Sequence, residues 1–508
     1  MSMRSKFTYL HLTKNFSYFK KLGIKGPKPV IIFGNLLDLL FVSKPDLEVK
    51  RLKQFGTIYG IFEGNKPLIQ VAEPELIKQI LVTDFRLFNT KVRITNIGHP
   101  VIERMLVSVR GDAWRRTRTA VSPAFAIGRM RRQYAQIRHC VGAQLVNQLQ
   151  TCANNCAPVD VKRMYGCFTL SAMTWCAFGA RTDPYRDFGH PFVANAWPVF
   201  KLPLWKLLAL QVLPRFVLRV LRLNSLFNEK CIANITQTIL KIMRAKESAG
   251  DKSDDFINVV MNSKLGPNEE LPDDNNPDDE ENLVMRSKTD DNIGTKKSLT
   301  EEEIVAQGFI FFTAAFDQMA NLLSFITYEL ALKPEAQDRL YEEIAAAVDA
   351  DGEIGYNELS RLPYMDAVVN ETLRLHAAPV KLRRTPGRDF PLGDTGIVVP
   401  RGQPLEIPIY AIHHSDKFYP NADQFIPDRF LPENRHNLKP YTFMPFSTGP
   451  RVCVGKPFAL MEAKLALVHV LRRFRFAAHK DTKVPPIVKT HPMMKSLESL
   501  YISVEARD

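Results

Sequence analysis

The clearest pattern in the chain is one long apolar helix in its second half. A capping box that begins at Thr300 predicts where this helix starts, and Pro334 predicts where it ends. Nearly every position from 304 to 316 is apolar, so we expect the helix to be buried on all sides. Asp317 and Gln318 lie near its middle, which favours a core helix of a large α-helical domain over a membrane span.

A second apolar region, residues 196–223, has a different periodicity. Arg215, Arg219 and Arg222 recur at helical spacing and form a basic stripe, while aromatic and aliphatic residues fill most of the remaining surface. This arrangement is typical of a helix that lies in a membrane interface. A core-packed helix can have the same pattern, so both interpretations stay open.

The first 28 residues contain no acidic side chain, several basic ones and several aromatic ones. Such a segment predicts binding to a membrane surface or a transit peptide, with a frayed tail as the alternative. No apolar run of about 18 residues, the length that a spanning helix needs, occurs in this part of the sequence. We therefore expect a segment at 1–28 that lies on a membrane rather than crossing it.

One segment differs in composition from the rest of the chain. Residues 264–297 are rich in Asp, Asn, Pro and Glu, which predicts a disordered surface insertion at about 264–298. The chain of 508 residues is otherwise ordinary for a globular protein, with 45% hydrophobic and 24% charged residues. Its net charge of +14 predicts a basic surface suited to an acidic partner protein or anionic lipid. Its 7 cysteines are odd in number and scattered, which indicates a reducing compartment.

The strongest chemical signal is the loop from Phe446 to Gly455, which contains Cys453. Glycines on both sides of the cysteine allow a tight loop, and a helix is predicted at 456–471 directly after it. Amide groups at a helix start favour the thiolate form of a nearby cysteine. One thiolate cannot make a closed zinc site, which needs four ligands, but it can be the axial ligand of a haem.

This loop matches the F-x-x-G-x-R-x-C-x-G pattern, and the chain thereby resembles the cytochrome P450 family of haem-thiolate monooxygenases. Three further segments resemble that family in the same order along the chain: Trp114 with Arg118, the E-x-x-R of Glu371 and Arg374, and residues 425–430. The resemblance extends from residue 26 to the end of the chain. Details at 19–24 and 504–508 are similar to the microsomal family-3 branch, which oxidises drugs and steroids.

The resemblance implies one mainly α-helical fold with small β-sheets, shaped as a triangular prism around a long central helix. In that arrangement residues 29–508 form a single catalytic domain, and residues 1–28 are a separate basic segment.

The resemblance also assigns roles to residues around a haem b whose iron is bound by Cys453. The haem propionates would be held by Trp114, Arg118, Arg384 and Arg451, with Arg383 as an alternative to Arg384, and Phe446 would lie beside the ligand. A structural network would join Glu371, Arg374 and Arg429. The substrate pocket would be lined by Ile310, Thr313, Ala314, Ala378, Val380 and Met493. We interpret the neighbouring pair His413-His414 as structural rather than metal-binding.

One position departs from the family pattern. The family has an acid followed by a threonine at the middle of the long helix, and the chain has Asp317 followed by Gln318. The resemblance gives Asp317 a role in proton delivery. An amide can donate a hydrogen bond to oxygen but is a poor proton relay, so Gln318 puts the coupling of electron use to oxygenation in doubt.

The sequence therefore predicts an oxidoreductase that inserts one oxygen atom from O2 into a lipophilic molecule such as a xenobiotic, steroid or fatty acid. Electrons would come from NADPH through cytochrome P450 reductase, with cytochrome b5 as a second candidate partner. Two alternatives stay open: a reductase-independent isomerase or dehydratase of lipid peroxides, and a non-enzymatic haem or lipid binder. The expected location is the cytoplasmic face of the endoplasmic reticulum membrane, with mitochondrial import as the alternative. No motif for binding nucleic acid accompanies the basic residues.

Overall fold

The computed structural model describes most of the chain. The described residues are 13–40, 43–88, 99–201, 205–206, 215–221, 223, 225, 227–263, 298–376, 379–490 and 495–507. Nearly all of the expected insertion at 264–298 lies outside this part of the chain, as do Ala378 and Met493 from the expected pocket.

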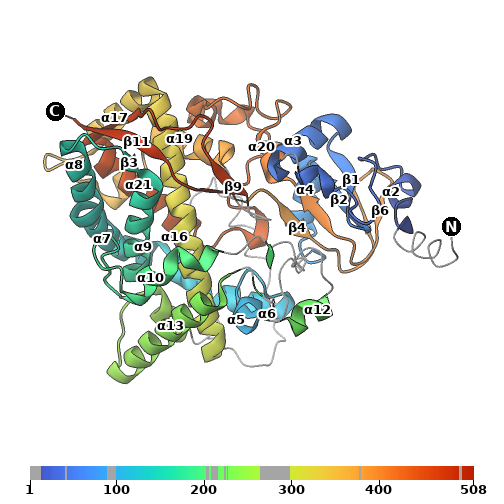
Figure 1. The fold of residues 1–508 in the computed structure, drawn as a ribbon, viewed down its shortest axis with the longest axis horizontal. Coiled ribbons are helices and arrows are strands. Elements are labelled where there is room, and N and C mark those ends of the chain that lie inside the picture. Colours follow the sequence, from blue (N-terminus) through green and yellow to red (C-terminus); the bar gives the residue numbers. More distant parts are fainter. Residues whose placement is uncertain are drawn as a thin grey trace.

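Helices make up most of the described structure (Figure 1). The α-helices are α2 (Tyr18–Lys21), α3 (Lys44–Phe55), α4 (Pro74–Lys78), α5 (Pro100–Arg104), α6 (Gly111–Val121), α7 (Ile127–Cys140), α8 (Asn147–Asn154), α9 (Val161–Phe178), α10 (Pro191–Ala196), α12 (Arg215–Val220), α13 (Glu229–Ala249), α14 (Phe256–Met261), α16 (Glu301–Leu332), α17 (Pro334–Ala347), α18 (Tyr356–Leu359), α19 (Pro363–Leu375), α20 (Ile409–His413) and α21 (Lys456–Leu471).

The strands form small separate sheets. They are β1 (Ile58–Glu63), β2 (Lys66–Val71), β3 (Val159–Asp160), β4 (Leu382–Arg384), β5 (Phe390–Pro391), β6 (Val398–Val399), β7 (Leu405–Ile407), β8 (Phe474–Ala478), β9 (Val488–Thr490), β10 (Lys495–Leu497) and β11 (Tyr501–Ala506). One sheet has the order β1-β2-β7-β4, with β2 and β7 parallel, and another has the order β3-β11-β8. The hairpins β9-β10 and β5-β6 are antiparallel. A mainly helical fold with small sheets confirms the expected class.

The long helix α16 runs through the middle of the helical part of the molecule (Figure 1). Its start is a capping box in which Thr300 accepts a hydrogen bond from the Glu303 amide and the Glu303 carboxylate accepts one from the Thr300 amide. Its end is at Leu332, directly before Lys333-Pro334. Both ends therefore agree with the sequence prediction.

Several helices and strands surround α16, and the most extensive contact is with α9. By length and composition α16 is the one helix of the described chain that could cross a membrane. However, 67% of its most apolar stretch is buried inside the protein. The buried apolar side chains form one continuous cluster from Phe19 to Val504, and α16 contributes to it along its whole length.

Candidate functional site

The loop before α21 places Cys453 at the amino end of that helix. The Cys453 amide donates a 2.9 Å hydrogen bond to the carbonyl oxygen of Phe446, which closes the loop. The Lys456 amide, at the first position of α21, points back to the Cys453 carbonyl oxygen at 3.4 Å. Cys453 is solvent-exposed, whereas four other cysteines are buried, and no described cysteine forms a disulfide.

Gly449 occupies the turn of this loop, a position at which no side chain fits. Its φ is +70°, in the left-handed region that favours glycine. A Cβ atom at this position would lie 2.1 Å from the carbonyl oxygen of Leu81, so any other residue would collide with the backbone there. The loop is thereby held against the segment that follows α4.

Two arginines lie next to the cysteine loop, Arg451 buried and Arg118 partly buried. Arg118, on α6, donates a 2.9 Å hydrogen bond to the carbonyl oxygen of Val452 and interacts electrostatically with Cys453. Arg451 stacks its guanidinium on the indole of Trp114, 4.3 Å from the ring centre, and donates to the Val109 carbonyl oxygen at 3.4 Å. Burial lowers the pKa of Arg118 to about 10, and burial together with neighbouring cations lowers the pKa of Arg451 to about 9.

The structure separates the roles of the two consecutive arginines at 383 and 384. Arg383 forms ion pairs with the carboxylates of Glu406 and Glu63. Arg384 is fully buried, donates to the carbonyl oxygen of Arg383 at 3.0 Å and forms no ion pair with any carboxylate of the described residues. Arg384 also lowers the pKa of Arg451, so these two cations lie near each other.

This set of cations fits the propionates of a haem. Within the described residues, Arg118 and Arg384 have backbone carbonyl acceptors and no acidic partner, although burying a cation without an anion is costly. The Nε–H groups of both are buried and donate no hydrogen bond to any acceptor in the described chain. A dianionic group beside Cys453 would supply the missing charge, and arginine forks suit carboxylates. The side chains present therefore match a haem with Cys453 as its axial ligand.

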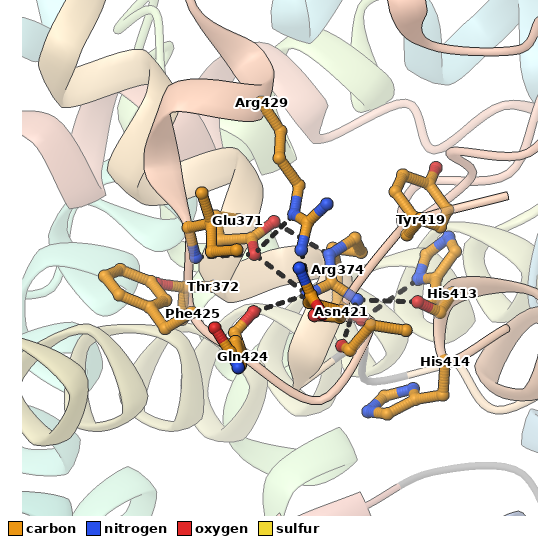
Figure 2. A network of polar contacts seen from close by, with 12 residues as sticks. Glu371, Thr372, Arg374, His413, His414, Tyr419, Asn421, Gln424, Phe425 and Arg429 are labelled. Carbon is orange, nitrogen blue, oxygen red and sulfur yellow. Dashed lines mark hydrogen bonds and ion pairs between the residues drawn. The ribbon is translucent and has the colours of Figure 1, made fainter. Parts of the chain in front are cut away.

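A fully buried ion pair lies behind this loop. Glu371 and Arg374, one turn apart on α19, are both 0% exposed and form two hydrogen bonds of 2.7 and 2.8 Å. The same guanidinium donates to the carbonyl oxygens of His413, Ala422 and Gln424. Figure 2 shows these acceptors gathered around the Arg374 guanidinium. All five N–H groups of the guanidinium are thus used within the protein.

Arg429 is the third member of this network. Its Nε lies 3.3 Å from a Glu371 carboxylate oxygen, and Nη2 donates to the Asn421 carbonyl oxygen at 2.9 Å. In Figure 2 the Arg429 guanidinium lies beside the carboxylate of Glu371 and close to Arg374. The structure therefore brings together Glu371, Arg374 and Arg429.

His413 connects the network to the cysteine loop. Its Nδ1 lies 3.2 Å from the Arg374 carbonyl oxygen, and its Nε2 accepts a 3.1 Å hydrogen bond from the amide of Met444. The Ser447 amide in turn donates to the Met444 carbonyl oxygen at 3.0 Å. Burial, reinforced by Arg374, lowers the pKa of His413 to about 3, so the ring is neutral with its proton on Nδ1.

One face of α16 is accessible at its middle. Ala314 is exposed, and Ile310, Asp317 and Gln318 are half-buried, as expected for residues at helical spacing on one side. Thr313 differs from the expectation, since it is 4% exposed and its hydroxyl donates to the carbonyl oxygen of Phe309 at 3.0 Å. Its hydroxyl is consumed within its own helix because a buried threonine satisfies its donor there.

The remaining expected pocket residue within the described chain is Val380. It is fully buried, and its carbonyl oxygen accepts a 3.1 Å hydrogen bond from the Tyr410 amide. It lies between the end of α19 and strand β4, which carries Arg384. A backbone hydrogen bond therefore fixes the segment that holds Val380 to the start of α20.

Asp317 has a partner that the sequence did not indicate. Its carboxylate forms a 2.7 Å ion pair with Lys162 of α9, and both side chains are largely buried. Asn321, one turn further along α16, and Ser496 of β10 bind the same carboxylate. The sequence analysis missed Lys162, and it interpreted His413 as structural without indicating its partner. The partners lie 155 and 31 residues away, and no local motif marks such contacts.

Acids neutralise part of the positive charge on helices α6 and α7. Arg116 pairs with Glu303, and Arg132 pairs with Asp254 at 2.6 Å. Arg129 lies 3.6 Å from the same Asp254 carboxylate. The arginines of these two helices therefore contribute less net positive charge than their number in the sequence suggests.

The comparisons with known proteins agree with this geometry. A family model described as "Cytochrome P450" matches residues 24–503. The chain is similar to cytochrome P450 3A29 of Sus scrofa, at 31% identity over 98% of this chain and 94% of that protein. It is also similar to cytochrome P450 3A28 of Bos taurus at 31% identity and to cytochrome P450 3A7 of Homo sapiens at 30% identity, over the same shares.

Proposed function

The chain belongs to the cytochrome P450 family and is a haem monooxygenase, and from that premise we propose that it oxygenates lipophilic molecules with electrons delivered by an NADPH-dependent reductase. We assign Cys453 as the axial ligand of the haem. We assign Asp317 to proton delivery and Gln318 to donating a hydrogen bond to dioxygen. The observation that carries this assignment is the cysteine loop with Arg118 and Arg384, neither of which pairs with an acid in the described chain.

In this proposal the buried cations bind and orient the cofactor. Arg118, Arg384 and Arg451 hold the propionates, and the indole of Trp114 supports Arg451 through stacking. When bound, the thiolate-ligated haem supplies the activation of dioxygen. The Glu371 network and His413 fix the backbone before Cys453, which keeps the sulfur in position without touching substrate.

Residues of α16 then control protons and solvent. The Asp317 carboxylate holds or releases a proton at its oxygens, and the Gln318 amide donates a hydrogen bond but relays protons poorly. Ile310 and Ala314 present an apolar surface beside them, which excludes water and favours a lipophilic substrate. Lipophilic substrates such as steroids, drugs or fatty acids match this apolar surface.

A second candidate function follows from Gln318. A haem-thiolate enzyme that rearranges lipid hydroperoxides needs no reductase and no proton relay from a threonine. The half-buried amide at this position favours that alternative as much as an unusual monooxygenase. The partly basic face around Cys453 favours a reductase partner, because an acidic flavoprotein is attracted to it.

We place the enzyme on the cytoplasmic surface of the endoplasmic reticulum, bound through exposed apolar side chains. Val30, Ile31, Ile32 and Phe33 are 42–58% exposed, and Trp205, Val220 and Leu221 are 54–79% exposed. Large apolar side chains in contact with water are typical of a lipid-binding surface.

The test is a reconstitution with NADPH–cytochrome P450 reductase over a panel of lipophiles, with NADPH use, peroxide release and product measured together. Reductase-dependent product from the native chain supports the monooxygenase. If the native chain releases only peroxide while Gln318→Thr forms product, reductase-driven oxygenation is not its reaction. Conversion of lipid hydroperoxides without NADPH would then identify the alternative.

A further inference from the structure

Four polar side chains meet around the middle of α16, on the side that faces α9 and the C-terminal hairpin. Lys162, 8% exposed, directs its ammonium group to the Asp317 carboxylate at 2.7 Å, the Asn321 side-chain oxygen at 2.9 Å and the Asp317 carbonyl oxygen at 3.1 Å. All three hydrogen-bond directions of the ammonium are therefore used by α16.

The Asp317 carboxylate is held on both oxygens. Lys162 binds Oδ1, while Asn321 donates to Oδ2 at 3.1 Å and the Ser496 hydroxyl donates to it at 3.2 Å. The carboxylate is thus oriented by groups from three separate elements. A side chain with this many contacts has little freedom to turn unless at least one of them breaks.

The cluster also fixes the hairpin β9-β10 against α16. The Leu497 amide donates to the Asn321 side-chain oxygen at 3.0 Å, beside the contact from Ser496. Both residues belong to β10, which directly follows the 491–494 segment of the expected substrate pocket. A displacement of β10 therefore acts on the same two side chains that hold Asp317.

Stability does not explain a lysine at this position. Burial lowers the pKa of Lys162, which is the cost of desolvating its charge, and Asp317 offsets that cost only in part. An apolar side chain of similar length would avoid this cost, since buried ion pairs are often no better than apolar packing. The position of the pair, next to Gln318 on the accessible face of α16, points instead to a role at the site.

We propose that Lys162 is a positioning residue, whose ammonium group holds the Asp317 carboxylate turned toward β10, and that coupling of NADPH use to product depends on this contact. The inference rests on the proposed oxygenation, in which Asp317 serves proton delivery. Lys162 itself touches neither substrate nor cofactor in this scheme. Ser496 and Asn321 transmit the position of β10 to the carboxylate.

The test compares Lys162→Met, which removes the charge at nearly the same length, with Lys162→Arg, which keeps it. The control is Lys464→Met, because Lys464 is also a buried lysine, paired with Asp366 at 2.5 Å on other helices. Product per NADPH, KM and amide hydrogen exchange at residues 495–500 are measured on the haem-loaded enzyme with its reductase.

For Lys162→Met we expect product per NADPH to fall by about tenfold, peroxide to rise, and KM to change by less than about twofold. Exchange at the Leu497 amide should accelerate, and Lys162→Arg should restore most of the coupling. We expect Lys464→Met to lower only thermal stability. If Lys162→Met likewise lowers only thermal stability and leaves product per NADPH unchanged, the inference is wrong.

Two further arms keep the result decisive. If Lys162→Met does not fold, Ser496→Ala removes one hydroxyl from the same carboxylate, and an unchanged product per NADPH in that variant overturns the inference. If the native enzyme forms no product with any lipophile, the proposed function fails. Exchange at Leu497 still tests the cluster, because an unaltered rate in Lys162→Met contradicts the coupling to β10.

Discussion

The backbone amide of Met444 donates a 3.1 Å hydrogen bond to Nε2 of His413. Through this bond the buried ion pair of α19 is connected to the loop that carries Cys453, because the other ring nitrogen of His413 lies 3.2 Å from the Arg374 carbonyl oxygen. The histidine has no motif around it and does no chemistry in the proposed reaction. Its position nevertheless makes it part of the support for the metal ligand.

Replacing His413 by leucine should loosen the cysteine loop. The Met444 amide would lose its acceptor, and a buried donor without a partner costs about 1–3 kcal/mol. We expect a lower melting temperature of the apoprotein and faster loss of haem to an apomyoglobin acceptor. His436→Leu, at an exposed position, is the control and should change neither quantity. Unchanged haem release in His413→Leu would show that the loop does not depend on this bond.

The same histidine should make stability depend on pH in a defined direction. The pKa of His413 is lowered from 6.5 to about 3 in the folded chain, so the unfolded chain binds its proton first as the pH falls. The contribution of neutral His413 to the free energy of unfolding is fully present above pH 6.5. It is lost between pH 6.5 and 3, by about 1.4 kcal/mol per pH unit. Urea denaturation at pH 7 and pH 5 should show this loss, and His413→Leu should lack it.

Arg384 and Arg383 should respond in opposite ways to replacement by leucine. Arg384 has no acidic partner in the described chain, so Arg384→Leu should leave apoprotein stability unchanged or raise it while haem affinity falls at least about tenfold. Arg383 pairs with Glu406, so Arg383→Leu should destabilise the apoprotein by about 3–5 kcal/mol. Haem titration and urea denaturation of both apoproteins separate the two effects. Equal haem affinity in native chain and Arg384→Leu would refute the propionate role.

Glu462 should destabilise the protein at neutral pH. Its side chain is 0% exposed, its carboxylate has no hydrogen-bond partner among the described residues, and burial raises its pKa well above the usual value. The unfolded chain therefore releases this proton first as the pH rises, and stability is lost above pH 4.5. Glu462→Met should raise stability at pH 7 by about 1–3 kcal/mol and less at pH 4. The exposed Glu342→Met is the control.

The exposed apolar side chains should bind membranes. Val220 and Leu221 are 79% and 54% exposed, and their joint replacement by aspartate should shift the protein from sedimented vesicles to the supernatant. Ile31 and Ile32, replaced in the same way, should add to that shift. Val484→Asp is the control, because Val484 is similarly exposed, at 66%, but lies before β9 and outside both proposed membrane-binding surfaces. Equal sedimentation of all variants would exclude these surfaces as the membrane contact.

The sequence predicts those features that depend on neighbouring residues. The limits of α16 follow from a capping box and a proline, and α21 follows from an apolar run directly after a glycine loop. The ion pair of Glu371 and Arg374 needs only the spacing of one helical turn. The role of Gly449 likewise depends on a local backbone angle.

Contacts between distant segments cannot be predicted from the residues that neighbour each partner in the sequence. Nothing around Lys162 indicates that it pairs with Asp317, and nothing around Arg383 shows that Glu406 and Glu63 neutralise it while Arg384 stays without an acid in the described chain. The burial of Thr313 also depends on which neighbour covers its side of α16. Helical spacing alone places it on the accessible face, and tertiary packing decides otherwise.

The sheet β3-β11-β8 imposes an order on the biosynthesis of this protein. Strand β11 pairs with β3 at residues 159–160, and the Val161 amide donates to the carbonyl oxygen of Leu500. The cluster around Asp317 likewise needs Ser496 and Leu497 from the last part of the chain. Before β10 has been synthesised, α9 and α16 can form, but the hydrogen bonds around the Asp317 carboxylate stay incomplete. The cluster is therefore completed only after residues 496 and 497 have been synthesised, and a chain stalled before β10 exposes a lysine and an aspartate that belong in its interior.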